Sequence, residues 1–489
     1  MVFSNLIFIY VFLPLNLLFY ALAKNIQTKN AVMLIFSLLF YAWGEPKYVL
    51  LLIGMTFADW LLAMLIEKSG SSGMAKLWMI SACIVNLGLI GVFKYGTFAV
   101  SNVQALTGFP SAVPVIALPI GISFYTFQIL SYVIDVYRGQ VRAQRNFAHL
   151  LMYVSLFHQC IAGPIVRYKD ISDEILGRST NPARFSAGVT RFAIGLGKKA
   201  LLANTCGSIT DAILLADKVA SDAGNLAANT AALSSKPALL LWLGVLAFML
   251  QIYLDFSAYS DMAIGMGLMI GFHYKENFLY PYTASSVSQF WRLWHISLSS
   301  FFRDYVYFPL GGSRKGMLRT IFNLFVVWLL TGLWHGASWN FVLWGLYFFV
   351  FIAAEKIFLG RLLEKIPKIF GRGYLLSVVF FSWIIFRFRR LPLVWVVLKG
   401  LFGANGNAFT SFEAKTMWLN YLFFLVVAVI AVTPLLKNIG KITSDEKMRN
   451  FPWDKVIAYA RIPAVAAIIL LSTFALVGNS YNPFLYFQF

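Results

Sequence analysis

The chain has 489 residues, of which 60% are hydrophobic and 12% are charged, and its mean hydropathy is +0.73. Soluble globular domains carry roughly 25% charged residues, so this composition excludes an ordinary soluble protein. The net charge of +20 does not indicate a nucleic-acid-binding protein, because Lys and Arg stand in short clusters between apolar runs, as in membrane proteins that follow the positive-inside rule. Apolar runs long enough to cross about 30 Å of hydrocarbon recur along the chain, and we predict one all-α integral membrane domain over residues 1–489.

The first apolar segment, Leu6 to Ala23, ends in a sequence that imitates a signal-peptidase site. A signal peptide carries positive charge before its apolar region. Here no basic residue precedes the segment, whereas Lys24 and Lys29 follow it. We therefore predict an uncleaved first helix with its N-terminus outside.

Further apolar segments follow in close succession, separated by short polar links. We expect about eleven to thirteen membrane-entering segments in the whole chain. The next four are Ala31 to Trp43, Tyr48 to Ile66, Leu77 to Phe93 and Val115 to Val133.

The segment from Leu150 to Ile165 carries His158 and the pair Gly163-Pro164 within an apolar run. We predict a re-entrant segment, which requires a backbone that is buried in protein or lines a wet cavity. The densely basic stretch from Arg167 to Lys199 is predicted to be cytosolic, and the small-residue-rich stretch from Ser221 to Lys236 is predicted to lie outside.

A predicted span from Leu239 to Tyr253 leads into two carboxylates, Asp255 and Asp261, amid hydroxyl and aromatic side chains. Ionisable groups within a membrane are costly, so they mark a functional site or a structural hydrogen-bond hub. Together with His335 they leave open a proton-coupled secondary transporter. The chain shows no internal repeat, which weakens that alternative.

Two Trp-His pairs, Trp294-His295 and Trp334-His335, flank a basic, glycine-containing turn from Gly311 to Gly316. Capping and helical spacing predict a helix from Val287 to Arg303, in which His295 shares a face with Trp291. The apolar run that ends in the second pair places His335 deep in the protein. The turn suits a phosphate of an acyl donor, but a solvated cytosolic loop fits it better.

A neutral imidazole in an apolar site has a lowered pKa, because burial disfavours the charged form. It can accept a proton from a hydroxyl at neutral pH, as the general base of an acyl transfer must. A second histidine could orient it or donate to the developing oxyanion. Histidines at membrane interfaces are often structural, so the residues alone leave catalysis by His335 open.

The remaining predicted spans are Trp339 to Ala354, Leu375 to Ile385, Tyr421 to Leu436 and Ala464 to Val477. Arg387, Arg389 and Arg390 follow the second of these and are predicted to anchor it at the cytosolic face. The three cysteines lack metal-ligand spacing, so we expect neither a disulfide framework nor a metal site.

Several ordered motifs carry a resemblance to a known family over nearly the whole chain. They are Phe40 to Gly44, Leu118 to Gln128, Ile161 to Tyr168, Tyr253 to Ser257, the two Trp-His pairs and Asn482 to Phe487. With them the sequence resembles the membrane-bound O-acyltransferase (MBOAT) family, in particular its bacterial branch of alginate O-acetyltransferase membrane subunits. His158 and Cys160 depart from the pattern, because relatives usually carry proline and leucine there.

The resemblance implies a ring of transmembrane helices around a central funnel, with short re-entrant helices on the cytosolic side. It also implies that His335 is the catalytic histidine and that His295 is the second motif histidine. The expected function is passage of an acetyl group from a cytosolic thioester donor, acetyl-coenzyme A or an acyl carrier, across the cytoplasmic membrane for O-acetylation of an extracytoplasmic polysaccharide.

The same resemblance implies an extracytoplasmic SGNH-type acetyltransferase as partner and no permanently bound cofactor. Two other activities of the family stay open at this point, peptidoglycan O-acetylation and D-alanyl export for teichoic acid. The sequence alone identifies neither the polysaccharide nor the donor.

Overall fold

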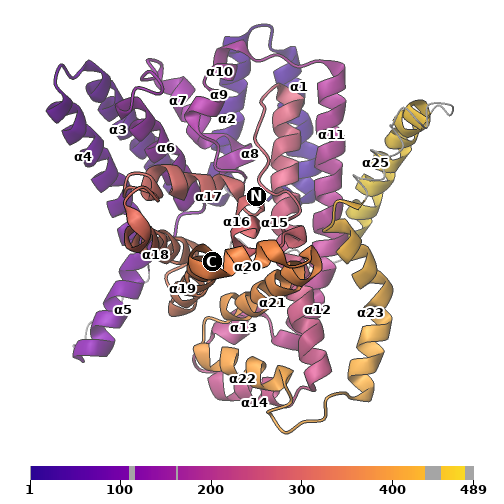
Figure 1. Ribbon diagram of the computed structural model, residues 1–489. Helices are drawn as coiled ribbons and strands as arrows, with labels where there is room; N and C mark the ends of the chain where they lie inside the picture. Colours follow the sequence, from indigo (N-terminus) through magenta and orange to yellow (C-terminus); the bar gives the residue numbers. More distant parts are fainter. Residues whose placement is uncertain (1, 109–115, 161–162, 436–452, 479–489) are drawn as a thin grey trace. The chain divides into compact units, whose positions relative to one another are not determined.

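The computed structural model describes residues 2–108, 116–160, 163–435 and 453–478, and the regular elements in these ranges are all helices (Figure 1). Four predictions fall partly outside them: the start of the span at Val115, residues 161–162 of the segment from Leu150 to Ile165, the same two residues of the motif from Ile161 to Tyr168, and the end of the span at Leu436. The C-terminal motif from Asn482 to Phe487 lies wholly outside the described residues.

The chain packs as two compact units, residues 1–193 with 259–276 and residues 194–258 with 277–489. Two helices belong in part to each unit, α11 (Pro182–Gly197) and α15 (Ala238–Ile270). The assignment of residues 1–489 to a single membrane domain stays a prediction.

The first unit begins with apolar helices and continues with shorter ones. Asn25 and Asn146 each start a helix, because their side chains accept the N–H groups of Thr28 and His149. The elements are η1 (Phe8–Phe12), α1 (Leu13–Leu22), α2 (Ile26–Gly44), α3 (Tyr48–Lys68), α4 (Ser72–Ile90), η2 (Gly91–Tyr95), α5 (Gly96–Thr107), α6 (Ile122–Tyr137), α7 (Phe147–Ser155), α8 (Phe157–Cys160), α9 (Tyr168–Ile171), α10 (Glu174–Gly177) and most of α11.

The predicted re-entrant segment from Leu150 to Ile165 is built from α7 and α8. These helices have 9 and 4 residues, and a helix needs about 20 residues to cross a bilayer. Every residue of α8 is buried, so its backbone is covered by protein. The segment is not a simple helical span, and its re-entrant placement stays a prediction.

The second unit holds the two Trp-His pairs. Its elements after the end of α11 are η3 (Lys198–Ala203), α12 (Asn204–Leu214), α13 (Asp217–Ser221), α14 (Leu226–Ser234), the first part of α15, η4 (Pro281–Thr283), α16 (Val287–Leu293), α17 (Ile296–Phe302), η5 (Arg303–Tyr307), α18 (Gly316–His335), α19 (Trp339–Ala354), η6 (Glu355–Leu359), α20 (Gly360–Lys365), α21 (Lys368–Arg387), α22 (Leu391–Leu401), α23 (Phe412–Ala431) and α25 (Trp453–Gly478).

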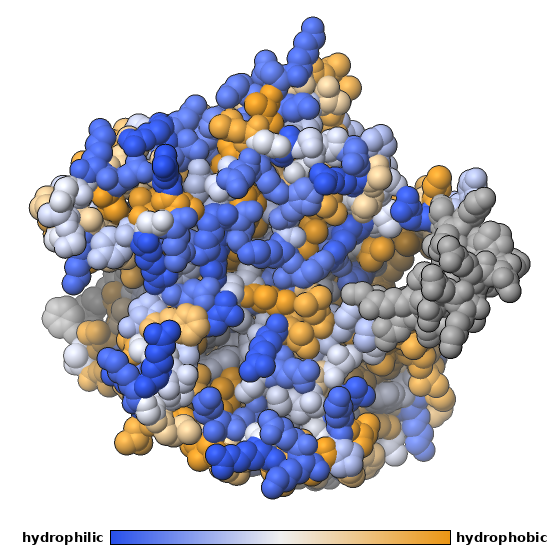
Figure 2. Space-filling view, turned by 45° about the horizontal axis from the view of Figure 1, so that its top comes forward, coloured by the Kyte–Doolittle hydropathy of each residue, from blue (hydrophilic) through white to orange (hydrophobic). Residues whose placement is uncertain are grey.

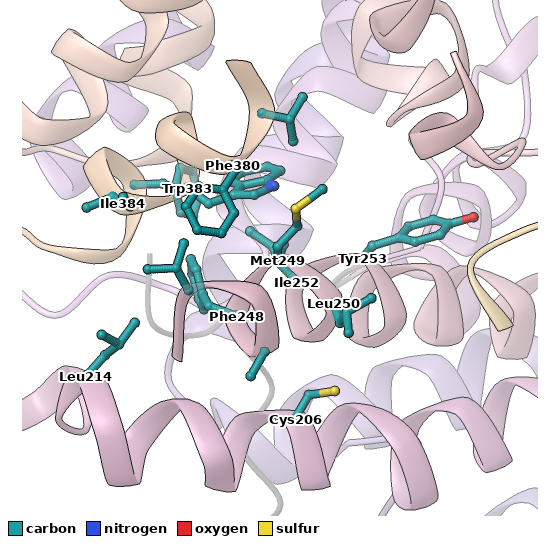
Figure 3. Close-up of a cluster of buried hydrophobic side chains, with 14 of the residues drawn as sticks. Cys206, Leu214, Phe248, Met249, Leu250, Ile252, Tyr253, Phe380, Trp383 and Ile384 are labelled. Atoms are coloured by element: carbon teal, nitrogen blue, oxygen red, sulfur yellow. The ribbon is translucent and has the colours of Figure 1, made fainter. Parts of the chain in front are cut away.

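The core of the second unit is apolar and aromatic. Figure 3 shows side chains of α12, α15 and α21 gathered between these helices, among them Leu214, Phe248 and Trp383. Trp383 is 1% exposed, and Phe248 is equally covered. This packing fixes α21 against α15 and supports the residues that surround the second Trp-His pair.

The described residues contain eight helical stretches that are long and apolar enough to cross a membrane, with two shorter apolar helices, Phe8–Leu22 and Leu391–Leu401. Large apolar side chains are exposed on several of them, such as Phe423 at 82% and Leu318 at 90%. Figure 2 shows apolar residues at the surface between hydrophilic ones. Contact with lipid accounts for such exposure, and the chain is a multi-pass membrane protein.

α15 is much longer than predicted. The predicted span ended at Tyr253, whereas the helix has 33 residues and continues to Ile270. It can hold Asp255 and Asp261 within a helix because each carboxylate has a cationic partner, Lys199 and Arg191 respectively. An ion pair offsets part of the cost of burying a charge, and a buried charge without its partner would be strongly destabilising.

Three helices of the second unit gather their basic ends on one side. α18 and α19 are antiparallel neighbours, so the segments before α18 and after α19 lie at the same end. After α19, the Glu355 carboxylate accepts the backbone N–H groups of Val287 and Ser288. The start of α21 lies there too, since a Cβ on Gly371 would stand 2.6 Å from the Ser285 carbonyl oxygen. The basic residues of these segments are Arg314, Lys315, Lys356, Arg361, Lys365, Lys368 and Arg372.

The opposite ends of α19 and α21 meet at Asn340. Its side-chain amide donates to the carbonyl oxygen of Phe386 at 3.1 Å. The next residue, Arg387, is 4% exposed and pairs with Asp211 at 2.8 Å and Asp217 at 3.3 Å. Arg387 is therefore a buried ion-pair partner.

These contacts set two of the predicted locations against each other. The Arg390 side chain donates to the Ser221 carbonyl oxygen at 3.0 Å. A cytosolic cluster of Arg387, Arg389 and Arg390 and an outer segment from Ser221 to Lys236 therefore exclude each other. The other basic residues concentrate at the opposite end of α21, and two aspartates neutralise Arg387. The positive-inside rule therefore favours the opposite end as the cytosolic one, and the sidedness stays a prediction.

Candidate active site

His335 is the last residue of α18 and is 8% exposed. Aromatic rings surround it, with ring centroids at 5.0 Å for Trp334, 4.8 Å for Trp344 and 5.3 Å for Phe386. These rings come from α18, α19 and α21. The deep position predicted for His335 from the apolar run is confirmed.

Glycines let α19 approach α18 closely enough to make this setting. A Cβ on Gly345 would stand 2.3 Å from the carbonyl oxygen of Trp328, and one on Gly332 would stand 2.4 Å from that of Phe341. Small residues allow such close contact between membrane helices. The crossing brings Trp344 of α19 against the imidazole at the end of α18.

The helix predicted from Val287 to Arg303 is interrupted at the first Trp-His pair. α16 ends at Leu293 and α17 begins at Ile296, and His295 between them has a left-handed backbone with φ of +43°. A left-handed conformation costs an L-residue about 1–2 kcal/mol. His295 therefore does not share a helical face with Trp291, and that prediction was wrong.

Asn277 supplies the reason for the interruption. Its side-chain oxygen accepts the Ser297 backbone N–H at 3.1 Å and lies 3.2 Å from His295 Nδ1. Its backbone carbonyl accepts the Ile296 N–H at 3.0 Å. Helix starts leave N–H groups without intrahelical partners, and a residue distant in sequence satisfies them here. No local pattern in the sequence marks Asn277 for this role.

The imidazole rings of His295 and His335 both contact the same indole, that of Trp334. The ring of Trp334 lies 5.6 Å from that of His295 and 5.0 Å from that of His335. The structure thus brings together the two residues that the sequence analysis selected as catalytic. His295 is fully buried, and burial lowers its pKa from 6.5 to about 3. At neutral pH this imidazole is uncharged and can act as a proton acceptor.

A cavity of about 430 Å³ opens beside this pair in the second unit. Three cationic side chains line it, Arg292 from α16, Arg303 from η5 and Lys356 from η6. The indoles of Trp291 and Trp328 form an apolar part of its wall and lie 4.7 Å apart. The lining also includes the hydroxyl side chains of Ser288, Ser299, Ser300 and Tyr307.

Neither histidine lines the cavity, but residues of α18 that precede His335 do. Trp328 lines the cavity and precedes His335 by two turns, which corresponds to about 10 Å along the axis of a helix. An anion bound by the three cationic side chains of the cavity would thus be separated from His335 by at least this length of helix. Such a layout suits a long ligand with a charged head and a thin reactive arm.

The turn from Gly311 to Gly316 was considered as a phosphate site but was better explained as a solvated loop, and none of its residues lines the cavity. Asn323 fixes this turn, because its amide donates to the carbonyl oxygens of Gly312 at 2.9 Å and Leu310 at 3.3 Å. The cations of the cavity come from three elements and were missed. The available signal was the proximity of Arg292 and Arg303 to the first Trp-His pair.

Each of the two membrane carboxylates, Asp255 and Asp261, forms an ion pair with a cationic side chain. Asp255 and Lys199 lie 2.7 Å apart in the second unit, and both side chains are 2% exposed. In the first unit, Arg191 lies 2.7 Å from Asp261 and 2.5 Å from Glu276. A proton relay needs carboxylates that change protonation readily, and a cationic partner opposes that change. The pairs weaken the transporter alternative.

His158, the residue that departs from the family pattern, lies in the first unit. It is 1% exposed, and its Nδ1 lies 3.3 Å from the Tyr274 hydroxyl. Burial, together with the nearby positive charge of Arg178, lowers its pKa to about 3. This contact accounts for a polar side chain inside an apolar element.

Comparison with known proteins gives a consistent result. A sequence model of the MBOAT, membrane-bound O-acyltransferase, family matches residues 138–395. The probable alginate O-acetylase AlgI of Pseudomonas putida is 36% identical over 100% of both chains. The peptidoglycan O-acetyltransferase of Helicobacter pylori is 29% identical over 100% of this chain and 98% of its own. The teichoic acid D-alanyltransferase of Bacillus subtilis is 26% identical over 49% of this chain and 59% of its own.

Proposed function

The chain belongs to the membrane-bound O-acyltransferase family, and on that premise we propose that it passes an acetyl group from a cytosolic thioester donor across the membrane for O-acetylation of an extracytoplasmic polysaccharide. The observation that carries this proposal is that the buried histidines of the two Trp-His pairs, His295 and His335, both contact the indole of Trp334. A cavity with cationic side chains lies next to this cluster, since Ile296, the residue after His295, lines it. We place the enzyme in the cytoplasmic membrane, with the ring-and-funnel architecture of its family.

His335 is the general base in this proposal. Its imidazole takes the proton of the acceptor hydroxyl as that oxygen attacks the thioester carbonyl carbon. The carbon–oxygen bond forms, the carbon–sulfur bond breaks and the donor leaves as a thiol after receiving a proton. The aromatic rings of Trp344 and Phe386 exclude water from the reacting atoms, which limits hydrolysis of the thioester.

The cavity is the proposed donor site. Arg292, Arg303 and Lys356 suit the phosphates of coenzyme A or of a phosphopantetheine carrier, since hydrogen bonds between cations and phosphate are strong. The arm of either donor would extend along the wall at Trp328 toward His335. No cofactor held permanently is required by this scheme.

The acceptor is proposed from the comparisons. The AlgI protein of Pseudomonas putida aligns with this chain over the full length of both proteins, and its identity is higher than that of the peptidoglycan enzyme. We therefore favour an alginate-like or other exopolysaccharide as the acceptor. Peptidoglycan O-acetylation is the second candidate, because that relative also covers the whole chain. Teichoic acid D-alanylation has less support, since that relative matches about half of it. We propose an extracytoplasmic SGNH-type acetyltransferase as the partner that receives the acetyl group.

The test is acetyl transfer by the purified chain. In lipid nanodiscs with acetyl-labelled coenzyme A, the expected result is release of the free thiol and transfer of label to an added SGNH-type partner or polysaccharide. A parallel assay uses an acetylated acyl carrier protein as donor. A chain that moves solute across vesicles but cleaves neither thioester would be a transporter, and the proposed function would be rejected.

A further inference from the structure

We propose that Asn277 is a positioning residue that holds His295 with its ring proton on Nδ1, so that Nε2 presents a lone pair. The inference rests on the proposed function for its link to acyl transfer. The hydrogen-bond geometry on which it stands is independent of any substrate. Asn277 lies in the loop between α15 and η4 and is 0% exposed.

Backbone hydrogen bonds hold this loop on both sides of the left-handed residue. The Ile296 N–H donates to the Asn277 carbonyl at 3.0 Å, and the Leu279 N–H donates to the Leu293 carbonyl at 3.0 Å. His295 lies between these two bonds. Its unfavourable φ of +43° is thus maintained by contacts from a segment distant in sequence, as is common for strained residues at functional sites.

The Asn277 side chain has one orientation that satisfies its neighbours. The Ser297 backbone N–H lies 3.1 Å from it and can only donate, so the facing atom is the amide oxygen. The Ser297 hydroxyl donates to the same oxygen at 2.9 Å. Nδ1 of His295 lies 3.2 Å from this oxygen and 3.3 Å from the Ser297 hydroxyl oxygen. Because the Ser297 hydroxyl proton is directed at Asn277, both oxygens face Nδ1 as acceptors, and this arrangement places the ring proton on Nδ1.

The consequence is an unprotonated Nε2. Within the described residues this nitrogen is buried and has no hydrogen-bond partner. An unsatisfied buried polar group destabilises the folded protein, and the left-handed backbone of the same residue adds strain. The arrangement suits an acceptor for a proton or hydroxyl that arrives with substrate.

The groups that face His295 are mostly aromatic. Phe256 from α15, Phe278 from the same loop as Asn277 and Trp334 from α18 contact its ring. None of these titrates, and Asn277 and Ser297 do not titrate either. A charge placed at Asn277 would therefore act on His295 with no competing ionisable neighbour among these groups.

The first measurement is the protonation of His295 by side-chain ¹⁵N NMR of histidine-labelled protein in nanodiscs. His295→Gln identifies the signals among the five histidines. We expect a protonated Nδ1 and an unprotonated Nε2 at pH 7. In Asn277→Leu, which has similar volume but no acceptor, this tautomer should lose its preference. A protonated Nε2 in the unsubstituted chain overturns the inference, whatever the enzyme acetylates.

The second measurement is kinetic. With acetyl-coenzyme A as the probe, Asn277→Leu should lower kcat about tenfold to a hundredfold, as for residues that orient functional histidines elsewhere, with KM within about twofold. Asn277→Asp keeps the acceptor and adds negative charge, which raises the pKa of His295. The acid limb of its pH profile should move up by about one pH unit or more, and this variant also tests the inference if Asn277→Leu does not fold.

The matched control is Asn323→Leu. Asn323 is also 0% exposed and also holds backbone groups, but at the turn before α18. It should leave the His295 tautomer and the pH profile unchanged. The inference would be overturned if Asn323→Leu changed the His295 tautomer and the pH profile as much as Asn277→Leu does. Failure of the unsubstituted chain to cleave acetyl-coenzyme A rejects that donor, whereas the NMR result alone decides the role of Asn277.

Discussion

At the scale of single residues, the two histidines of the candidate site differ in their surroundings. His335 packs among aromatic rings at the end of α18. His295 lies in a left-handed turn that Asn277 stabilises by hydrogen bonds. A hydrogen bond at Nδ1 favours one tautomer of the His295 ring, which suits a fixed helper.

His335→Ala and His335→Gln should both lower acetyl transfer by about a hundredfold or more, because a general base contributes roughly 10²–10⁴-fold. The measurement is acetate bound to polysaccharide in cells, with membrane insertion checked by chromatography of the purified variants. A variant that inserts normally and retains full acetylation would remove His335 from the mechanism. His295→Ala is expected to be impaired as well.

Arg292→Gln should raise KM for acetyl-coenzyme A about tenfold while kcat changes little, since a charged hydrogen bond contributes about 1.5–3 kcal/mol and acts on binding. The matched control is Arg319→Gln. Arg319 donates to the Leu310 carbonyl and does not line the cavity. An equal KM for both variants would argue against the cavity as donor site.

At the scale of elements, the close crossing of α18 and α19 determines where His335 lies. The glycines at this crossing leave no room for a methyl group. Apolar runs predicted both helices, and the bounds of Trp339–Ala354 agree with α19 residue for residue. The break between α16 and α17 was not predicted, because helical spacing continues through it while hydrogen bonds from a distant loop interrupt the backbone.

Gly345→Ala should destabilise the folded protein by about 1–3 kcal/mol, because its Cβ would stand 2.3 Å from the Trp328 carbonyl oxygen and force the helices apart. Gly373→Ala is the matched control in α21, where a Cβ meets nothing within 4 Å. The control should be neutral or stabilising, since alanine favours a helix over glycine by about 1 kcal/mol. Thermal unfolding of both variants in the same detergent measures the difference, and equal midpoints would contradict the crossing.

At the scale of the whole molecule, only Lys and Arg residues that the fold leaves without a carboxylate partner should be counted when the membrane orientation is predicted. By the positive-inside rule, the Lys and Arg residues around η6 and α20 predict that these ends of α18, α19 and α21 lie in the cytosol. Arg387 at the other end of α21 belongs to a buried cluster with Asp211 and Asp217. Sequence alone counts Arg387 with the topogenic charges, and the ion pairs remove it from that count.

Cysteine labelling tests this orientation. Ser313→Cys, in the exposed basic turn, should react with a membrane-impermeant maleimide only from the cytosolic side. Asp222→Cys, in the exposed segment after α13, should react only from the outside. Replacing the partly exposed Cys83 by Ser removes background. Labelling of both positions from one side would contradict the assigned topology.

The sequence by itself determined the membrane class, most of the spans, the family and the two histidines, because apolar runs and short motifs are local properties of the chain. Only the tertiary structure decided that His295 lies in a strained turn, that Asn277 holds it, that Arg292, Arg303 and Lys356 line one cavity, and that Arg387 is neutralised. These features depend on hydrogen bonds and charges between residues far apart in sequence. Spacing along the chain does not encode such contacts, whereas packing of the helices creates them.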